Sequence, residues 1–138
     1  MLQHMPRYVI LEHSPGPAGP RDLHWDLMLD WGAALRTWAL EAPLTALGGA
    51  PGGVRRINAR RLDDHRRAYL DYEGPVSGDR GHVRRWDRGD FAAVHSNDSE
   101  LVLELRGERF AGRLRLVRDA GDAQCWTLSL VDSPSAAG

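Results

Sequence analysis

Apolar and polar residues alternate at every second position along much of this sequence, and this pattern limits the folds open to it. In the clearest segment, Leu23, Trp25, Leu27 and Leu29 alternate with mostly polar neighbours up to Asp30. Strict alternation is typical of a β-strand with one apolar and one polar face. Further strands are expected at residues 7–12, 101–106, 110–118 and 126–130. The sequence therefore predicts a mainly β fold.

Turn-forming dipeptides separate the expected strands. They are Trp31-Gly32, Arg88-Gly89, Asn97-Asp98, Arg106-Gly107 and Ala120-Gly121. Short strands joined by frequent turns favour an antiparallel sheet. Because closure of such a sheet removes its exposed edges, we expect either a barrel or a sandwich.

Three segments interrupt the alternation. Residues 14–20 and 42–53 contain too much proline and glycine for regular elements and are expected to form long loops. Residues 62–72 are ambiguous, and Asp63 or Asp64 could cap a short helix there. No repeat or domain boundary is visible, so we expect one domain over residues 1–138. Its core would span about residues 7–131, followed by a frayed tail at residues 133–138.

The basic residues are unusual, because all 18 are arginine and the chain has no lysine. This absence excludes Schiff-base chemistry, pyridoxal-phosphate enzymes and the P-loop lysine. Any anion must therefore be bound by arginine, histidine or backbone groups. The formal net charge of −1 excludes a uniformly basic nucleic-acid-binding surface but allows a local basic patch.

Cys125 is the only cysteine, which excludes an intramolecular disulfide and a cysteine zinc site. We expect it to be a small buried strand residue and not a nucleophile. No apolar run approaches the roughly 20 residues that a membrane-spanning helix needs. These features predict a cytoplasmic protein without membrane association.

The pair His24 and Asp26 is the sharpest chemical feature. Residues two apart on a strand share a face, so the imidazole and the carboxylate project side by side. His13 ends the preceding expected strand, and antiparallel pairing of the two strands would bring it close to His24. Two histidines and one aspartate form a facial ligand set for Mn²⁺, Zn²⁺ or Fe²⁺. The alternative is that these are three unrelated surface residues.

Two further groups could carry chemistry. His65 and Tyr69 would share a face if their segment were helical, and could then act as a general acid and a hydrogen-bond donor; alternatively, the segment is solvated with one buried tyrosine. Six arginines lie between residues 55 and 67. They could follow a phosphodiester backbone or simply form a solvated face.

Taken together, these features resemble the 3′-phosphoesterase domain of bacterial DNA ligase D, which also occurs as a stand-alone protein. The resemblance extends over about residues 7–131. No single motif of the resemblance is specific, but the order of the motifs along the chain and the spacing between them are specific. The motifs are the strand ending in His13, Leu23-His24-Trp25-Asp26, Thr37-Trp38-Ala39, Asp64-His65 with Tyr69, Asp71-Tyr72-Glu73-Gly74, Gly78 with Gly81, Trp86-Asp87-Arg88-Gly89 and the segment 105–113.

The resemblance implies a small closed antiparallel β-barrel with long loops and at most one or two short helices. It also implies a divalent metal, most often Mn²⁺, with Zn²⁺ or another transition metal as alternatives. By motif position the metal ligands would be His13, His24 and Asp26. The phosphate-contacting residues would be His65 and Tyr69, with Asp63 supporting His65 and Arg56 as an upstream phosphate-binding arginine.

Two departures from the family pattern bear on activity. The family has an arginine two residues after the metal aspartate, where this chain has Met28, and a lysine near the position of Ala42. Both losses remove positive charge that would stabilise a transition-state phosphoryl group.

The predicted function is therefore a metal-dependent 3′-phosphoesterase, both phosphodiesterase and phosphomonoesterase, that processes DNA or RNA-terminated DNA 3′ ends in DNA repair. We expect a monomer with a DNA ligase or polymerase as candidate protein partner. One alternative is a catalytically weak or silent module that binds metal and DNA ends; another is a phosphoesterase for a nucleotide or small phosphodiester.

Overall fold

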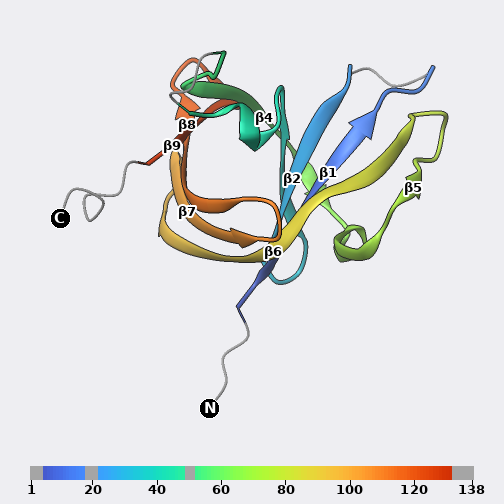
Figure 1. Ribbon diagram of the computed structural model, residues 1–138, viewed down its shortest axis with the longest axis horizontal. Helices are drawn as coiled ribbons and strands as arrows, with labels where there is room; N and C mark the ends of the chain where they lie inside the picture. The colour runs from blue at the N-terminus through green and yellow to red at the C-terminus, as the bar shows by residue number, and fades with distance from the viewer. Residues whose placement is uncertain (1–4, 18–21, 49–51, 132–138) are drawn as a thin grey trace.

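The computed structural model describes residues 5–17, 22–48 and 52–131, and nearly all of these residues lie in strands (Figure 1). The elements are β1 (Arg7–Ser14), β2 (His24–Asp30), β3 (Leu35–Leu40), η1 (Leu44–Ala46), β4 (Arg56–His65), η2 (Arg67–Asp71), β5 (Gly74–Pro75), β6 (His82–Ser96), β7 (Glu100–Gly107), β8 (Ala111–Asp119) and β9 (Asp122–Leu130). The two η elements are short 3-10 helices. Across the described ranges, no helix is long and apolar enough to cross a bilayer.

The strands form one closed antiparallel barrel. Their order is β1-β2-β3-β4-β9-β8-β7-β6, and β6 pairs back onto β1 to close the sheet. The short β5 pairs with the outer end of β6. In Figure 1 the barrel is seen nearly end-on, with β4, β8 and β9 opposite β1 and β2. The predicted fold class is confirmed, because the described residues form a closed barrel of eight strands, with β5 at its edge and two 3-10 turns as the helical elements.

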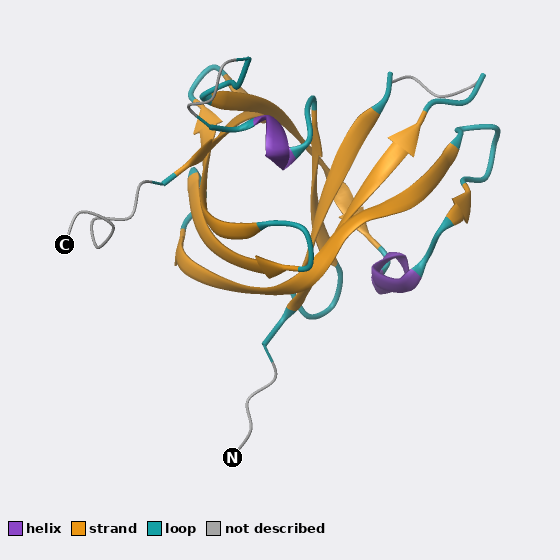
Figure 2. Cartoon of the chain, in the orientation of Figure 1, coloured by secondary structure: helices purple, strands orange, loops and turns teal. Residues whose placement is uncertain are grey.

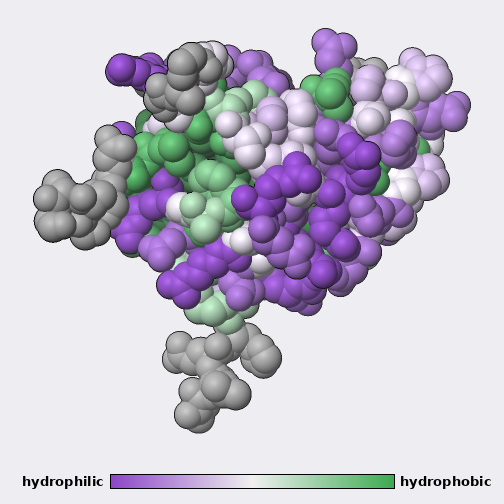
Figure 3. Space-filling view, in the orientation of Figure 1, coloured by the Kyte–Doolittle hydropathy of each residue, from purple (hydrophilic) through white to green (hydrophobic). Residues whose placement is uncertain are grey.

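The barrel interior is filled by the apolar residues of the alternating pattern. Both sides of the barrel contribute to this core, with Ile10, Leu27, Leu29, Trp38, Leu40, Ile57, Phe91, Leu103, Leu114, Leu116, Trp126 and Leu128 among its buried members. Leu44 of η1 packs into the same core. Figure 3 shows apolar side chains gathered within the curve of the sheet, while polar side chains cover most of the remaining surface in that view.

A second, smaller core lies on the outer face of the barrel. Its buried members are Val9, Leu11, Met28, Leu35, Leu70 and Val83, with Tyr69, Tyr72 and Val76 packed against them. Figure 2 shows the segment containing η2 and β5 beside β1, β2 and β6, outside the barrel. Because this segment covers only part of the outer face, it leaves space between itself and the strand ends. That space contains the candidate site.

The structure corrects three expectations. Arg88 and Gly89 do not form a turn but lie within β6, where Gly89 pairs with Gly107 and a Cβ would overlap the carbonyl oxygen of Arg106. Glycine is therefore needed there for close strand approach. Residues 56–65 form a strand, and η2 begins after Arg66 without a side-chain cap, so neither candidate aspartate caps a helix. Cys125 is half-buried on the outer face of β9 and contacts Asp122.

Of the expected loops, residues 42–53 contain η1, and the 14–20 loop is described only up to residue 17. The predicted frayed tail at residues 133–138 lies outside the described residues.

Candidate metal centre and its cavity

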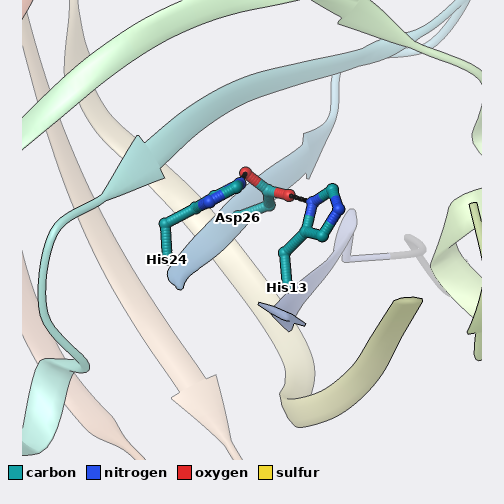
Figure 4. Close-up of side chains that lie close together, drawn as sticks. All are labelled: His13, His24 and Asp26. Carbon is teal, nitrogen blue, oxygen red and sulfur yellow. Dashed lines mark hydrogen bonds and ion pairs between the residues drawn. The ribbon is translucent and has the colours of Figure 1, made fainter. Parts of the chain in front are cut away.

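Antiparallel pairing of β1 and β2 brings the three expected metal ligands together. His13 lies directly opposite His24, and Leu11 lies opposite Asp26. The alternation of β2 turns His24 and Asp26 toward the outer face, where Met28 joins the outer core. Figure 4 shows one imidazole on each side of the Asp26 carboxylate. One ligand atom from each of the three residues lies within 4.8 Å of the others.

Hydrogen bonds to carbonyl groups fix the orientation of both imidazoles. The Nδ1–H of His24 donates to the carbonyl of Asp22 at 2.7 Å, and the Nε2–H of His13 donates to the carbonyl of Arg80 at 2.8 Å. Because a carbonyl can only accept, the other nitrogen of each neutral ring carries a lone pair. These nitrogens face the two oxygens of Asp26, each at 3.2 Å. Such outer hydrogen bonds commonly orient histidine ligands of metals.

The two imidazole nitrogens and the Asp26 carboxylate bring their lone pairs together at a point where, among the described residues, no arginine pairs with Asp26. The Asp26 side chain is only 4% exposed, and its Oδ1 receives no hydrogen bond from the described residues. Burial acts to raise the pKa of Asp26, but the two imidazoles outweigh it and hold that pKa below its ordinary value. Asp26 in turn raises the pKa of His13, against the effect of burial. Two imidazole nitrogens and one carboxylate therefore fit a divalent transition metal.

A cavity of about 340 Å³ opens beside the three ligands. It brings together six of the seven site residues predicted from sequence: His13, His24, Asp26, Asp63, His65 and Tyr69. Apolar side chains complete part of its wall, including Met28, Leu62, Val76 and Val83. The cavity is therefore a polar site with a partly apolar lining, as is usual for small-ligand sites.

β4 and η2 position the second group of site residues. His65 ends β4, and its Nδ1–H donates to the main-chain carbonyl of Asp63 at 2.8 Å. The contact thus comes from the backbone of Asp63, whose carboxylate is exposed. The ring of Tyr69 meets that of His65 edge-on, with centroids 5.6 Å apart. This arrangement leaves Nε2 of His65 available to a bound anion.

Two ion pairs fasten η2 to the barrel. At its start, Arg67 binds both carboxylate oxygens of Asp30, at 2.7 and 3.1 Å. At its end, Asp71 accepts a hydrogen bond from Arg7 at 2.7 Å. Leu70, between them, is buried in the outer core. These contacts hold Tyr69 at the cavity although η2 is only one short 3-10 segment.

Arg80 is a site residue that sequence reasoning missed. Its main-chain carbonyl orients His13, and its side chain lines the cavity. Its guanidinium also donates to the carbonyl and hydroxyl oxygens of Ser77. The only sequence signal was the pair of glycines at positions 78 and 81, which indicates a loop but not its contact with a residue 67 positions earlier.

Arg56 is the one predicted site residue that the structure does not bring to this cavity. It lies at the opposite end of β4 from His65, nine residues away, which corresponds to about 30 Å along a strand. Its side chain lines a different cavity.

Comparison with known proteins identifies the family. Residues 18–118 match the family model of the DNA Ligase D 3′-phosphoesterase domain. The chain belongs to this family. The part of the chain that matches the 3′-phosphoesterase model includes six of the seven predicted site residues, whereas His13 precedes it. The family resemblance predicted from sequence is thereby confirmed.

Two relatives of this 3′-phosphoesterase domain come from mycobacteria. The multifunctional non-homologous end joining DNA repair protein LigD of Mycobacterium tuberculosis is 30% identical, over a match that covers 83% of this chain and 15% of that protein. The multifunctional non-homologous end joining protein LigD of Mycobacterium bovis gives the same values. The chain therefore corresponds to a small part of these longer proteins.

Proposed function

We propose that this protein is a metal-dependent 3′-phosphoesterase that removes a terminal ribonucleoside and then a phosphate from nucleic-acid 3′ ends during DNA repair. The observation that carries the proposal is the convergence of two oriented imidazoles and a buried carboxylate in the same cavity as His65 and Tyr69. Membership of the 3′-phosphoesterase family supports the same chemistry. Manganese is the proposed metal, with zinc or another transition metal as alternatives.

His13, His24 and Asp26 would hold the metal. A bound divalent ion supplies Lewis-acid charge beside the scissile phosphate. The surrounding residues keep the ligands ready for it, because the carbonyls of Asp22 and Arg80 fix both imidazoles in the tautomer that binds metal. Apolar neighbours, including the buried Met28, limit access of water from the barrel side of the cavity.

His65 would act on the phosphate from the other side of the cavity. Its Nδ1–H is held by the Asp63 carbonyl, so protonation at Nε2 creates a donor for the leaving oxygen. The Tyr69 hydroxyl would add a hydrogen bond to a phosphate oxygen. Asp63 lines the same cavity, and its main-chain carbonyl would keep the His65 ring oriented toward the phosphate.

The test is turnover by the purified protein. With Mn²⁺ and a primer-template that carries a 3′-phosphate or a 3′-terminal ribonucleotide, we expect release of phosphate or of the nucleoside. The His24→Ala variant serves as the control, because it loses one metal ligand. Turnover no higher than that of this variant would reject the proposal.

Met28 favours a second candidate function, a silent module that binds metal and DNA ends. Its apolar side chain is 1% exposed and lines the cavity beside the metal ligands, where a phosphate would gain from a positive charge. This alternative predicts binding to DNA ends without product. A gain of turnover in Met28→Arg would support it, and failure to bind any nucleic acid at low salt would exclude it.

A further proposal concerns partners. We propose that the protein acts on DNA ends beside a DNA ligase or polymerase, since the names of the mycobacterial relatives place them in non-homologous end joining. Copurification with such an enzyme from the source cells is the direct test.

A further inference from the structure

A second cavity, of about 760 Å³, is not used by the proposed chemistry. It lies on the outer faces of β3, β4, β9 and β8, and we call it the arginine groove. Its charged lining residues are Arg56, Arg60, Arg115, Arg118, Glu41 and Asp119. Four guanidinium groups thus face two carboxylates, although the whole chain has a net charge of −1.

Strand register places the arginine groove beside the metal centre. Asp26 pairs with Ala39, Ala39 pairs with Arg60, and Arg60 pairs with Cys125. Residues directly opposite each other on paired strands share a face of the sheet. With strands about 4.8 Å apart, the backbone of Arg60 lies about 10 Å from that of Asp26. Only the methyl group of Ala39 stands between them on this face.

Small or polar side chains form the floor of the groove, and its arginines are spaced along and across the strands. A second row of paired residues runs from Arg56 through Ser129 to Arg115. Arg56 lies four residues before Arg60, about 13 Å along β4. Among the floor residues are Ala39, Asn58, Thr127 and Ser129. An extended ligand with repeated negative charges would fit this shape.

The contacts of the guanidinium groups leave much of this charge unneutralised. Within the described part of the chain, no side chain accepts a hydrogen bond from Arg56 or Arg118. Arg60 donates to the neutral Gln124 at 2.7 Å, and only Arg115 is paired with an acid, Glu100. Arginine binds phosphate through a planar fork of two N–H donors.

We propose that the arginine groove binds the phosphodiester backbone of the nucleic-acid strand whose 3′ end enters the metal cavity. The proposal rests on the proposed function for the identity of the strand that is bound. In this role the groove contributes affinity for nucleic acid that does not depend on base sequence, since the arginines recognise phosphates and not bases.

The test is a binding measurement with an oligonucleotide of about 12 nucleotides that ends in a 3′-hydroxyl, so that no reaction follows. Fluorescence anisotropy would compare the wild type with Arg56→Gln/Arg60→Gln over a range of salt concentrations. We expect the double variant to bind at least about tenfold more weakly and to show a shallower dependence of log K on log salt, by about one for each lost contact. Arg56→Lys/Arg60→Lys should recover most of the affinity, because it keeps the charge.

The charge-matched control is Arg88→Gln/Arg106→Gln, which removes two exposed arginines on β6 and β7 outside both cavities. It should bind within about twofold of the wild type. Equal loss in both double variants, or no loss in either, would overturn the inference. Equally tight binding of polyglutamate would assign the groove to an acidic protein instead.

Failure of the two proposals gives different results. If the groove variants bind normally while the wild type releases phosphate, only the groove is rejected. If the groove variants lose affinity while the wild type forms no product, only the enzymatic proposal is rejected.

Discussion

His13 and Asp26 face each other across two strands with a lone pair on each side, Nδ1 lying 3.2 Å from Oδ2. The Arg80 carbonyl holds the only proton of the neutral His13 ring on the far nitrogen. The site is therefore completed by a positive charge, either a proton or a metal ion. This relationship explains why a carboxylate that is 96% buried is tolerated here although no arginine among the described residues pairs with it.

Asp26→Asn should abolish tight metal binding while preserving the fold. The amide is isosteric, and its NH₂ group can donate to the lone pair of His24, so the metal-free protein keeps a satisfied contact. We expect affinity for Mn²⁺ to fall at least about 100-fold. Isothermal titration with Mn²⁺ and a thermal melt would measure both properties. Asp63→Asn, which changes a carboxylate at the cavity edge, should bind Mn²⁺ normally; equal loss in both variants would contradict the assignment.

His65→Gln should separate chemistry from metal binding. The side chain lies in the metal cavity but on β4, outside the ligand set. We expect turnover of a 3′-phosphate substrate to fall by about 10² to 10⁴, the usual contribution of a general acid. Affinity for Mn²⁺ should stay within about threefold of the wild type. A variant that lost both together would place His65 among the metal ligands.

Gly81→Ala should weaken metal binding although it changes no ligand. Gly81 has φ +89°, and a Cβ there would overlap the carbonyl oxygen of Ser14, next to His13. The substitution must displace the backbone that carries the Arg80 carbonyl, so we expect Mn²⁺ affinity to fall about 10- to 100-fold. Titration with Mn²⁺ checks this.

Gly78→Ala is the matched control for that experiment. Its φ of +75° imposes the same backbone strain, but a Cβ would meet nothing closer than 3.7 Å. It should lose stability without losing metal affinity. If both alanine variants bind Mn²⁺ like the wild type, contact between this loop and His13 does not orient the ligand.

The strands and the ligand triad were predictable because both depend on short-range periodicity. Alternation over residues 23–30 gives the strand, its apolar face and the shared face of His24 and Asp26. One assumption, antiparallel pairing with the preceding strand, was then enough to place His13, and the register confirms that pairing. General rules on strand edges leave a barrel or a sandwich open, and the family resemblance favours the barrel.

The rest of the site depends on contacts that spacing does not encode. β4 has arginines on much of its outer face, so charge masks its alternation, and its final residues also fit the start of a helix. A bulge in the pairing of β3 with β4, between Leu35 and Thr37, shifts the strand register near His65 and interrupts the alternation of faces. The Arg80 carbonyl reaches His13 from a loop far along the chain. Sequence patterns specify faces of strands, whereas these contacts depend on how loops pack.

Asp87→Ala should be strongly destabilising. The Asp87 carboxylate is buried and accepts hydrogen bonds from the Tyr8 hydroxyl at 2.8 Å and from the backbone N–H groups of Arg109 at 2.8 Å and Phe110 at 3.1 Å. It thereby joins β1 to the turn between β7 and β8. Removing it leaves several buried donors unpaired, so we expect a loss of about 3 kcal/mol in the free energy of unfolding.

Tyr8→Phe provides the comparison, because it removes one of these bonds and keeps the apolar ring in the core. We expect it to cost about 1 to 2 kcal/mol. Urea denaturation of both variants measures the difference in the free energy of unfolding. A loss from Asp87→Ala no larger than that from Tyr8→Phe would show that the backbone donors form hydrogen bonds with water in the Asp87→Ala variant.

The ion pair between Asp30 and Arg67 should make the stability of the η2 attachment depend on pH. Hydrogen bonds from Arg67, opposed by partial burial and aided by the Gly32 N–H, lower the pKa of Asp30 below its ordinary value of 3.8. A carboxyl group with a lowered pKa in the folded state stabilises the protein above its unfolded pKa. This contribution disappears as the pH falls from 3.8 through the lowered value.

Asp30→Asn should therefore be less stable than the wild type near neutral pH, and the difference should shrink to nothing in strong acid. Urea denaturation from about pH 7 to about pH 2 follows it, and Asp30→Asn should have little effect in the Arg67→Gln background, where the carboxylate has already lost its partner. An effect of Asp30→Asn that is unchanged by Arg67→Gln would assign the stabilisation to the turn at Gly32 and not to the attachment of η2.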